Sequence, residues 1–388
     1  MRLSDSRAES RFRAELGEWL DENQPAADRA SDLPRSSGHI PGWAAEWQRC
    51  LFDAGWLVPR WPAELGGRDA GAIEQMIYLE ELSRRRLPRT VNPQGLDVCA
   101  PTLVDHGSDR QRAEWLPATL HGRVSWCVAV DAAGAPDDTD SGTLAPGAPV
   151  LTRADGERRL AGSLAGPPGA ADADRCLVAV RLVGHRSKDG DVAALALDLD
   201  ADGVTRPSGD GGTLELDGVL VDGADLVGER GQGWPVLASV RARQRSLRWI
   251  TSLLAIQRAL DSLADVGRAR GLAEDAVFRD RLARLQVESD GVRALAYRAL
   301  AKQGTGRANP ELAMLPLVTA EVEQRVYLTG VESLGADGLD LGLDGPMAWP
   351  SGSWAAEWLT STTDGAATGG PPAERDRVAA RVLGLPLR

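Results

Sequence analysis

Long helical patterns in the last third of the sequence limit the folds that this chain can adopt. Apolar residues recur at helical spacing through 233–270, 275–303 and 310–334, and Pro310 opens the third segment. Helices of this length owe most of their stability to the packing of an apolar face. The end of the chain therefore predicts a helical bundle, with a short last helix at 374–384.

The first 120 residues also carry helical patterns. Ser6 and Glu9 form a capping box ahead of one amphipathic stripe, and a second stripe stops at Gly55. The segments 72–85 and 109–120 are expected to be two further helices.

The middle of the chain has a different character. Short runs at 174–183, 192–199 and 213–221 alternate in polarity or are rich in β-branched residues, which is typical of strands. The stretch 131–148 is rich in Ala, Gly, Pro and Asp and is expected to be a long loop.

These patterns place the chain in the α+β class, because the helices and strands are segregated and do not alternate. We expect an N-terminal helical domain over 1–120 and a middle β domain, a barrel or a sandwich, over 121–229. A C-terminal four-helix bundle domain is expected over 230–388.

Charge and composition exclude several kinds of partner. The net charge is −12, so the field of the whole chain repels nucleic acid. No apolar run reaches the roughly 18 residues that a membrane-spanning helix needs, and the polar N-terminus is unlike a secretory signal. The four cysteines are scattered, which indicates buried thiols and neither a metal site nor a disulfide framework. We expect a cytoplasmic protein.

Four segments carry a family resemblance, in the same order as in the family. They are PGWAAEWQRCLFDAGWLVPRWPAELGG (41–67), HGSDRQRAEWLPATLHGRVSWC (106–127), GWPVLASVRARQR (233–245) and RVLGLP (381–386). The chain resembles the acyl-CoA dehydrogenases over nearly its full length, and most of all the actinobacterial members that work as paired, unlike subunits. The resemblance implies the fold of that family, FAD as cofactor, and α,β-dehydrogenation of a CoA thioester.

The catalytic base of the family has no counterpart in this sequence. In many members a glutamate in the long helix removes the α-proton of the thioester, and the aligned residue here is Gln244. An amide has no ionisable proton acceptor and cannot act as a general base. Some relatives keep the glutamate in the loop before the last helix, where this chain has Gly369.

The two flavin-binding motifs of the family are also degraded. Where the first motif places a hydroxyl donor, this chain has Asp131, whose charge would repel an electron-rich reduced flavin. In the second motif the stacking Trp aligns with Gly166, and the two hydroxyl residues align with Pro167 and Pro168. The aromatic platform and several donors are therefore lost together.

The resemblance favours a non-catalytic subunit, paired with a homologous flavin-bearing chain in an α2β2 heterotetramer. Acyl-CoA, steroid-derived or otherwise bulky, would bind through the partner, and FAD would lie at the interface and not on this chain alone. Arg279 is the candidate for a contact to the partner's FAD; its other interpretation is an exposed helix arginine. A purely structural scaffold differs only in having no residue that reaches the cofactor.

The alternative is a stand-alone enzyme of the same fold. It would bind flavin in an altered way with Asp131 or Glu374 as base, or carry out non-redox chemistry on a CoA thioester. The basic cluster Arg84, Arg85 and Arg86, with Arg89 close behind, is either a solvated helix end or a contact for a CoA phosphate.

Overall fold

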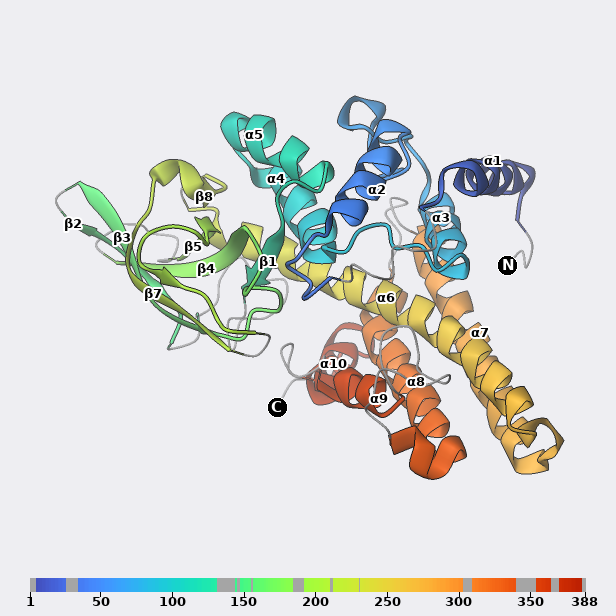
Figure 1. Ribbon diagram of the computed structural model, residues 1–388. Helices are drawn as coiled ribbons and strands as arrows, with labels where there is room; N and C mark the ends of the chain where they lie inside the picture. The colour runs from blue at the N-terminus through green and yellow to red at the C-terminus, as the bar shows by residue number, and fades with distance from the viewer. Residues whose placement is uncertain are drawn as a thin grey trace. The chain divides into compact units, whose positions relative to one another are not determined.

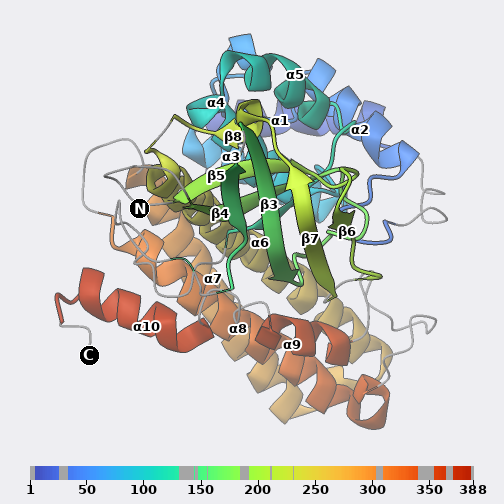
Figure 2. The same cartoon turned by 90° about the vertical axis from the view of Figure 1, so that its left-hand side faces the viewer.

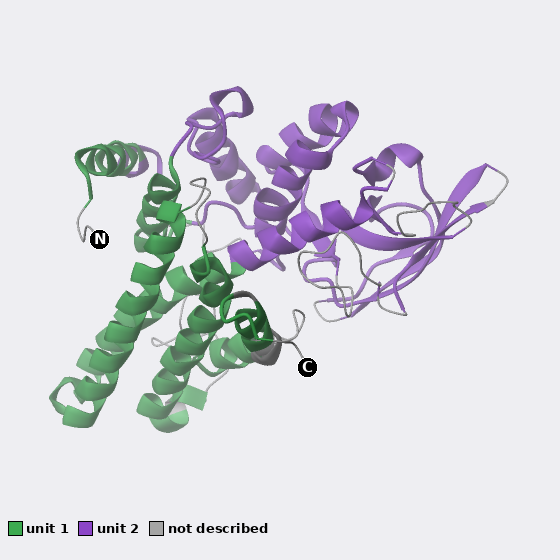
Figure 3. Ribbon diagram, turned by 180° about the vertical axis from the view of Figure 1, so that it is seen from behind, with its two compact units in different colours: residues 1–19, 71–87, 248–388 green, residues 20–70, 88–247 purple. Residues whose placement is uncertain are grey.

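The structure is a computed structural model that falls into two compact units (Figure 3). Unit 1 comprises residues 1–19, 71–87 and 248–388, and unit 2 comprises residues 20–70 and 88–247. The residues described are 5–25, 34–130, 144, 147–154, 156–183, 192–209, 212–229, 231–302, 309–339, 354–363 and 370–385.

Unit 1 is helical (Figure 1). Its helices are most of α1 (Arg7–Asn23), α3 (Ala72–Arg84), the second half of α6 (Gly233–Ala269), α7 (Ala276–Lys302), α8 (Glu311–Leu334), α9 (Trp354–Thr363) and α10 (Gly370–Arg381). The capping box at the start of α1 is present, since Glu9 accepts from the Ser6 amide and Ser6 Oγ accepts from the Glu9 amide at 3.3 Å.

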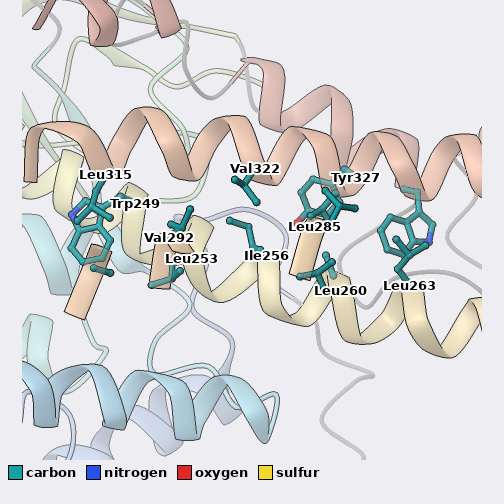
Figure 4. Packing of buried hydrophobic residues seen from close by; sticks show 14 of the residues in the cluster. Trp249, Leu253, Ile256, Leu260, Leu263, Leu285, Val292, Leu315, Val322 and Tyr327 are labelled. Carbon is teal, nitrogen blue, oxygen red and sulfur yellow. The ribbon is translucent and has the colours of Figure 1, made fainter. Parts of the chain in front are cut away.

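The core of unit 1 follows from the spacing of apolar residues on α6 (Figure 4). Trp249, Leu253, Ile256, Leu260 and Leu263 recur every three or four residues and are at most 4% exposed. They therefore lie on one face of the helix, which packs against buried residues of α7 and α8. Each such side chain contributes about 1.5–3 kcal/mol through burial.

Unit 2 combines a sheet with short helices (Figure 2). The helices are α2 (Gly42–Asp53), α4 (Ala100–His106), α5 (Asp109–Leu120) and the first half of α6, with a π-helical turn, η3 (Gln94–Cys99), ahead of α4. The strands are β1 (Trp126–Ala129), β2 (Val150–Ala154), β3 (Glu157–Ala165), β4 (Arg175–Val183), β5 (Val192–Asp198), β6 (Val204–Thr205), β7 (Thr213–Leu220) and β8 (Leu226–Val227).

The strands form one sheet in the order β6-β7-β3-β2-β4-β5-β8. β1 and β2 pair in parallel with successive parts of the same edge of β4, and the other pairs are antiparallel. Alternate residues of β4 enter different clusters: Leu177 packs with Trp115 and Trp234, and Val178 packs with Leu151. Both faces of β4 are therefore covered, which explains its nearly continuous apolar run.

The expected α+β elements are present. Helices at 72–85, 109–120, 233–270, 275–303 and 310–334 and strands at 174–183, 192–199 and 213–221 agree with the structure within one residue at each end. The last helix starts at Gly370 and not at 374, and α4 and α9 were not expected. Most of the loop expected at 131–148 lies outside the described residues, and the domain limits at 120 and 229 stay predictions.

Candidate functional site

Gln244 lies half-buried on the part of α6 that belongs to unit 2. Neighbouring arginines attach this part of the helix to its surroundings: Arg241 Nη2 donates to the Val130 carbonyl at 3.2 Å, and Arg243 pairs with Asp105 of α4. The first carboxylate of α6 is Asp261, about four to five turns beyond Gln244. The helix therefore offers no proton acceptor near the position of the missing base.

The loop that follows β3 contains Gly166, Pro167 and Pro168, the positions that the family resemblance matches to the second flavin motif. Gly166 has a φ of +54°, a backbone conformation that a tryptophan adopts only with strain. Pro167 is buried and Pro168 is exposed, and neither has a backbone N–H.

The remaining amides of this loop are largely committed within the protein. The Gly166 amide donates to the Gly212 carbonyl at 2.9 Å, and the Ala170 amide donates to the Pro167 carbonyl at 3.0 Å. The amides of Asp172 and Ala173 both donate to the Gly169 carbonyl, at 3.1 and 2.9 Å. A flavin ring needs an aromatic platform and donors for its carbonyl oxygens, and residues 166–173 do not fit that requirement. Asp131 and Gly369 lie outside the described residues.

Glu374 is buried on α10, where the sequence favoured a capping charge. Its carboxylate pairs with the guanidinium of Arg377, three residues further along the helix. The side chains are 8% and 13% exposed, respectively. The carboxylate is therefore engaged by a side chain of its own helix, which fits a structural role for Glu374.

Arg279 is exposed near the start of α7 and has no side-chain partner among the described residues. The other arginines of α7 all form ion pairs: Arg281 with Glu332 at 3.0 Å, Arg284 with Asp280 at 2.9 Å, Arg293 with Glu80 at 2.8 Å, and Arg298 with Glu311 at 2.6 Å. Within the described part of the chain, Arg279 is thus the arginine of this helix that has no ionic partner.

The basic cluster near the end of α3 is largely neutralised. Arg84 and Arg85 both pair with Glu81, which is 2% exposed, and Arg89 pairs with Asp97. These guanidiniums are engaged by carboxylates of the chain itself, which counts against a contact for a CoA phosphate.

One feature of unit 2 was not anticipated from the sequence. An open, polar cavity of about 590 Å³ lies at the start of α5 and is lined by residues that include Asp105, His106, Asp109, Arg112 and Glu229. Burial and the charge of Arg243 lower the pKa of His106, although Asp105 opposes the shift. In the described part of the chain, no group of acidic, His and Cys side chains could hold a metal ion, and no helix is long and apolar enough to cross a membrane.

Two family models match the sequence, and together they span more than half of it. Residues 6–123 match the acyl-CoA dehydrogenase N-terminal domain, and residues 231–370 match the acyl-CoA dehydrogenase C-terminal domain. The chain belongs to the acyl-CoA dehydrogenase family. Members of this family depend on FAD, a group that residues 166–173 of this acyl-CoA dehydrogenase chain do not fit.

Individual relatives agree over the whole chain. The acyl-CoA dehydrogenase IpdE1 of Mycobacterium tuberculosis is 28% identical, with 97% of each chain covered. The solved structure of the Tcur3481-Tcur3483 steroid ACAD is 24% identical, with all of both chains covered and a TM-score of 0.80. The ChsE4-ChsE5 complex from M. tuberculosis is 22% identical over all of both chains, with a TM-score of 0.79. The fold predicted from the sequence, with helical, β and helical parts, is therefore confirmed.

Proposed function

We propose that this chain is the non-catalytic subunit of a heteromeric acyl-CoA dehydrogenase. Its partner is a homologous chain that keeps the base glutamate and the flavin motifs, and the two assemble as an α2β2 heterotetramer. The complex oxidises the α,β-bond of a CoA thioester, and this chain supplies helical structure and one contact to the partner's FAD.

The proposal rests on the residues that this chain has at the base and flavin positions of the family, on an intact fold. Gln244 lies on a helix that offers no nearby carboxylate, and the loop at 166–173 has no aromatic platform and amides that are largely committed within the protein. A single substitution could accompany a base that moved elsewhere. Losses at two separate sites are better explained by chemistry that belongs to another chain.

Arg279 supports a role beyond that of a scaffold. A guanidinium that is exposed and unpaired within the described residues is suited to a phosphate, which it can bind through two parallel hydrogen bonds. In an FAD shared between chains, the diphosphate is the group with this chemistry. We therefore assign Arg279 to the partner's FAD.

We infer the class of substrate from the solved structures that this chain resembles. One is described as a steroid ACAD and named for two chains, and another is a complex of two named chains. These likenesses favour a steroid-derived or other bulky acyl-CoA and an assembly of unlike subunits.

The stand-alone alternative gains no support from the described residues. Its candidate base Glu374 is committed to Arg377, and its other candidate, Asp131, lies outside the described residues.

Co-expression with the homologous chain of a neighbouring gene tests the proposal. We expect the two chains to co-purify and the complex to oxidise a bulky acyl-CoA. Replacing the partner's base glutamate with glutamine should abolish turnover, whereas Gln244→Ala in this chain should leave it unchanged. Turnover by this chain without any partner would contradict the proposal.

A further inference from the structure

The loop at 166–174 is held from outside by a short segment that precedes α2. Asp172 accepts hydrogen bonds from Ser36 Oγ at 2.7 Å and from Arg35 Nη2 at 3.0 Å, and Arg35 and Asp172 also form an ion pair. Both partners of Asp172 come from residues 35–39, which we call the strap. All of these residues belong to unit 2.

Two glycines bring the strap and the loop into backbone contact. A Cβ at Gly38 would lie 2.0 Å from the Gly169 carbonyl oxygen and 2.7 Å from the Ala173 nitrogen. A Cβ at Gly169 would lie 2.6 Å from the Gly38 nitrogen. Only glycine fits at either position, because any side chain would collide with backbone that cannot move aside.

The strap is itself anchored to the core of unit 2. Asn92, which is 3% exposed, donates through Nδ2 to the Ser37 carbonyl at 2.6 Å and to the Trp126 carbonyl at 2.8 Å. The Trp126 amide donates back to Asn92 Oδ1 at 2.9 Å. The strap is therefore attached to the start of β1 as well as to the loop.

The far end of the loop is fixed too. The carboxylate of Asp174 accepts from the Ser125 amide at 2.7 Å, and the Asp174 amide donates to Ser125 Oγ at 3.1 Å. Arg206 Nη1 donates to the Ala173 carbonyl at 2.5 Å. Contacts thus hold the loop from both sides, and most of its amides donate to oxygen atoms of the protein itself.

We infer that the strap fixes residues 166–174 in the conformation described here, which offers a flavin ring neither an aromatic platform nor a set of free amide donors. The loss of the aromatic and hydroxyl side chains is then only part of the change. Restoring those side chains does not restore flavin binding while Gly38 and Gly169 remain in contact. This inference rests on the proposed function, and it adds a backbone contact to the lost side chains as a reason for the poor fit to flavin.

Hydrogen exchange on the isolated chain tests the strap directly. We expect slow exchange at the amides of Ala170, Asp172 and Ala173, and faster exchange after Gly38→Ala, by about tenfold or more, the factor that ~1.4 kcal/mol of local stability represents. Gly42→Ala is the matched control, because a Cβ there meets nothing within 4 Å. Asp172→Asn is a milder second variant with a smaller expected acceleration, should Gly38→Ala fail to fold.

Flavin uptake gives the second readout. The variant Gly166→Trp/Pro167→Thr/Pro168→Ser should bind no FAD, measured by flavin retention in gel filtration. Uptake of FAD by this variant with the strap intact would overturn the inference, and so would unprotected amides in the unmodified chain. Neither result would touch the proposed function, which fails instead if the unmodified chain binds FAD and turns over acyl-CoA alone.

Discussion

The carboxylate of Glu374 is buried on α10 and paired with the guanidinium of Arg377, three residues later. Removing one partner of a buried ion pair leaves an uncompensated charge, at a cost of about 3–5 kcal/mol. We expect Arg377→Met to lower the free energy of unfolding by an amount of this order, and the double variant with Glu374→Gln to recover much of it. Urea unfolding of the four proteins in the double-mutant cycle measures this.

The variant Glu374→Gln also tests whether Glu374 has a structural or a catalytic role. Turnover of the complex, counted per folded complex, should be unaffected by Glu374→Gln. Loss of turnover without loss of stability would instead identify Glu374 as a base.

Arg279 should affect flavin retention and not assembly. A charge-assisted contact contributes about 1.5–3 kcal/mol, so Arg279→Ala should weaken FAD binding by the complex by roughly tenfold to a hundredfold. Arg284→Ala is the matched control, because Arg284 lies on the same helix and is paired with Asp280 at 2.9 Å. Equal FAD affinity in the two variant complexes would contradict a contact between Arg279 and FAD and would favour a purely structural role for this chain.

The sequence was informative where periodicity is strong. The helical spacing of apolar residues through 233–270 predicted a long helix of the bundle, and the apolar run at 174–183 predicted the strand β4. Short helices with weak sequence signals were not predicted. One example is α4, which has only seven residues, has a proline in its first turn and follows a π-helical turn. The boundaries of such elements depend on tertiary contacts.

For the candidate site, the sequence predicted only which positions differ from the motifs of the family. The family resemblance pointed to Gln244, Gly166, Pro167 and Pro168, but not to the residues that surround them. Glu374 and Arg377 lie three residues apart on one helix, and the burial of their ion pair depends on how that helix is oriented. Gly38 and Gly169 come into contact only when the chain folds. Because Gly38 and Gly169 are far apart in the sequence, no local sequence pattern predicts their contact.

Gly330 on α8 should tolerate no larger residue. A Cβ there would lie 2.1 Å from Trp354 Cε3, inside the core of unit 1. We expect Gly330→Ala to destabilise the chain by about 1–3 kcal/mol through overpacking. Gly291→Ala on the exposed face of α7, where a Cβ meets nothing within 4 Å, should instead stabilise it by about 0.5–1 kcal/mol. Thermal unfolding of both variants measures these changes in stability. A stabilising effect of Gly330→Ala would contradict the close packing of Gly330 against Trp354.

Glu81 should make stability depend on pH in the acid range. Burial raises the pKa of its carboxyl, but hydrogen bonds from Arg13 and Arg85 and the charge of Arg84 outweigh burial, and the net pKa is lowered. A lowered pKa in the folded state contributes stability that is present above the unfolded value of about 4.3 and is lost as pH falls through the folded value. Urea unfolding of Glu81→Gln should show a lower free energy at neutral pH and a flatter decline toward acid pH. An unchanged slope would exclude Glu81 as a source of this dependence.

The flavin content of the isolated chain tests the central claim most directly. The chain is purified alone, incubated with excess FAD, passed through gel filtration, and examined for the flavin absorbance band, in parallel with the complex formed with its homologous partner. We predict a colourless isolated chain and a yellow complex that oxidises acyl-CoA. An isolated chain that retains stoichiometric FAD and oxidises acyl-CoA would contradict the account.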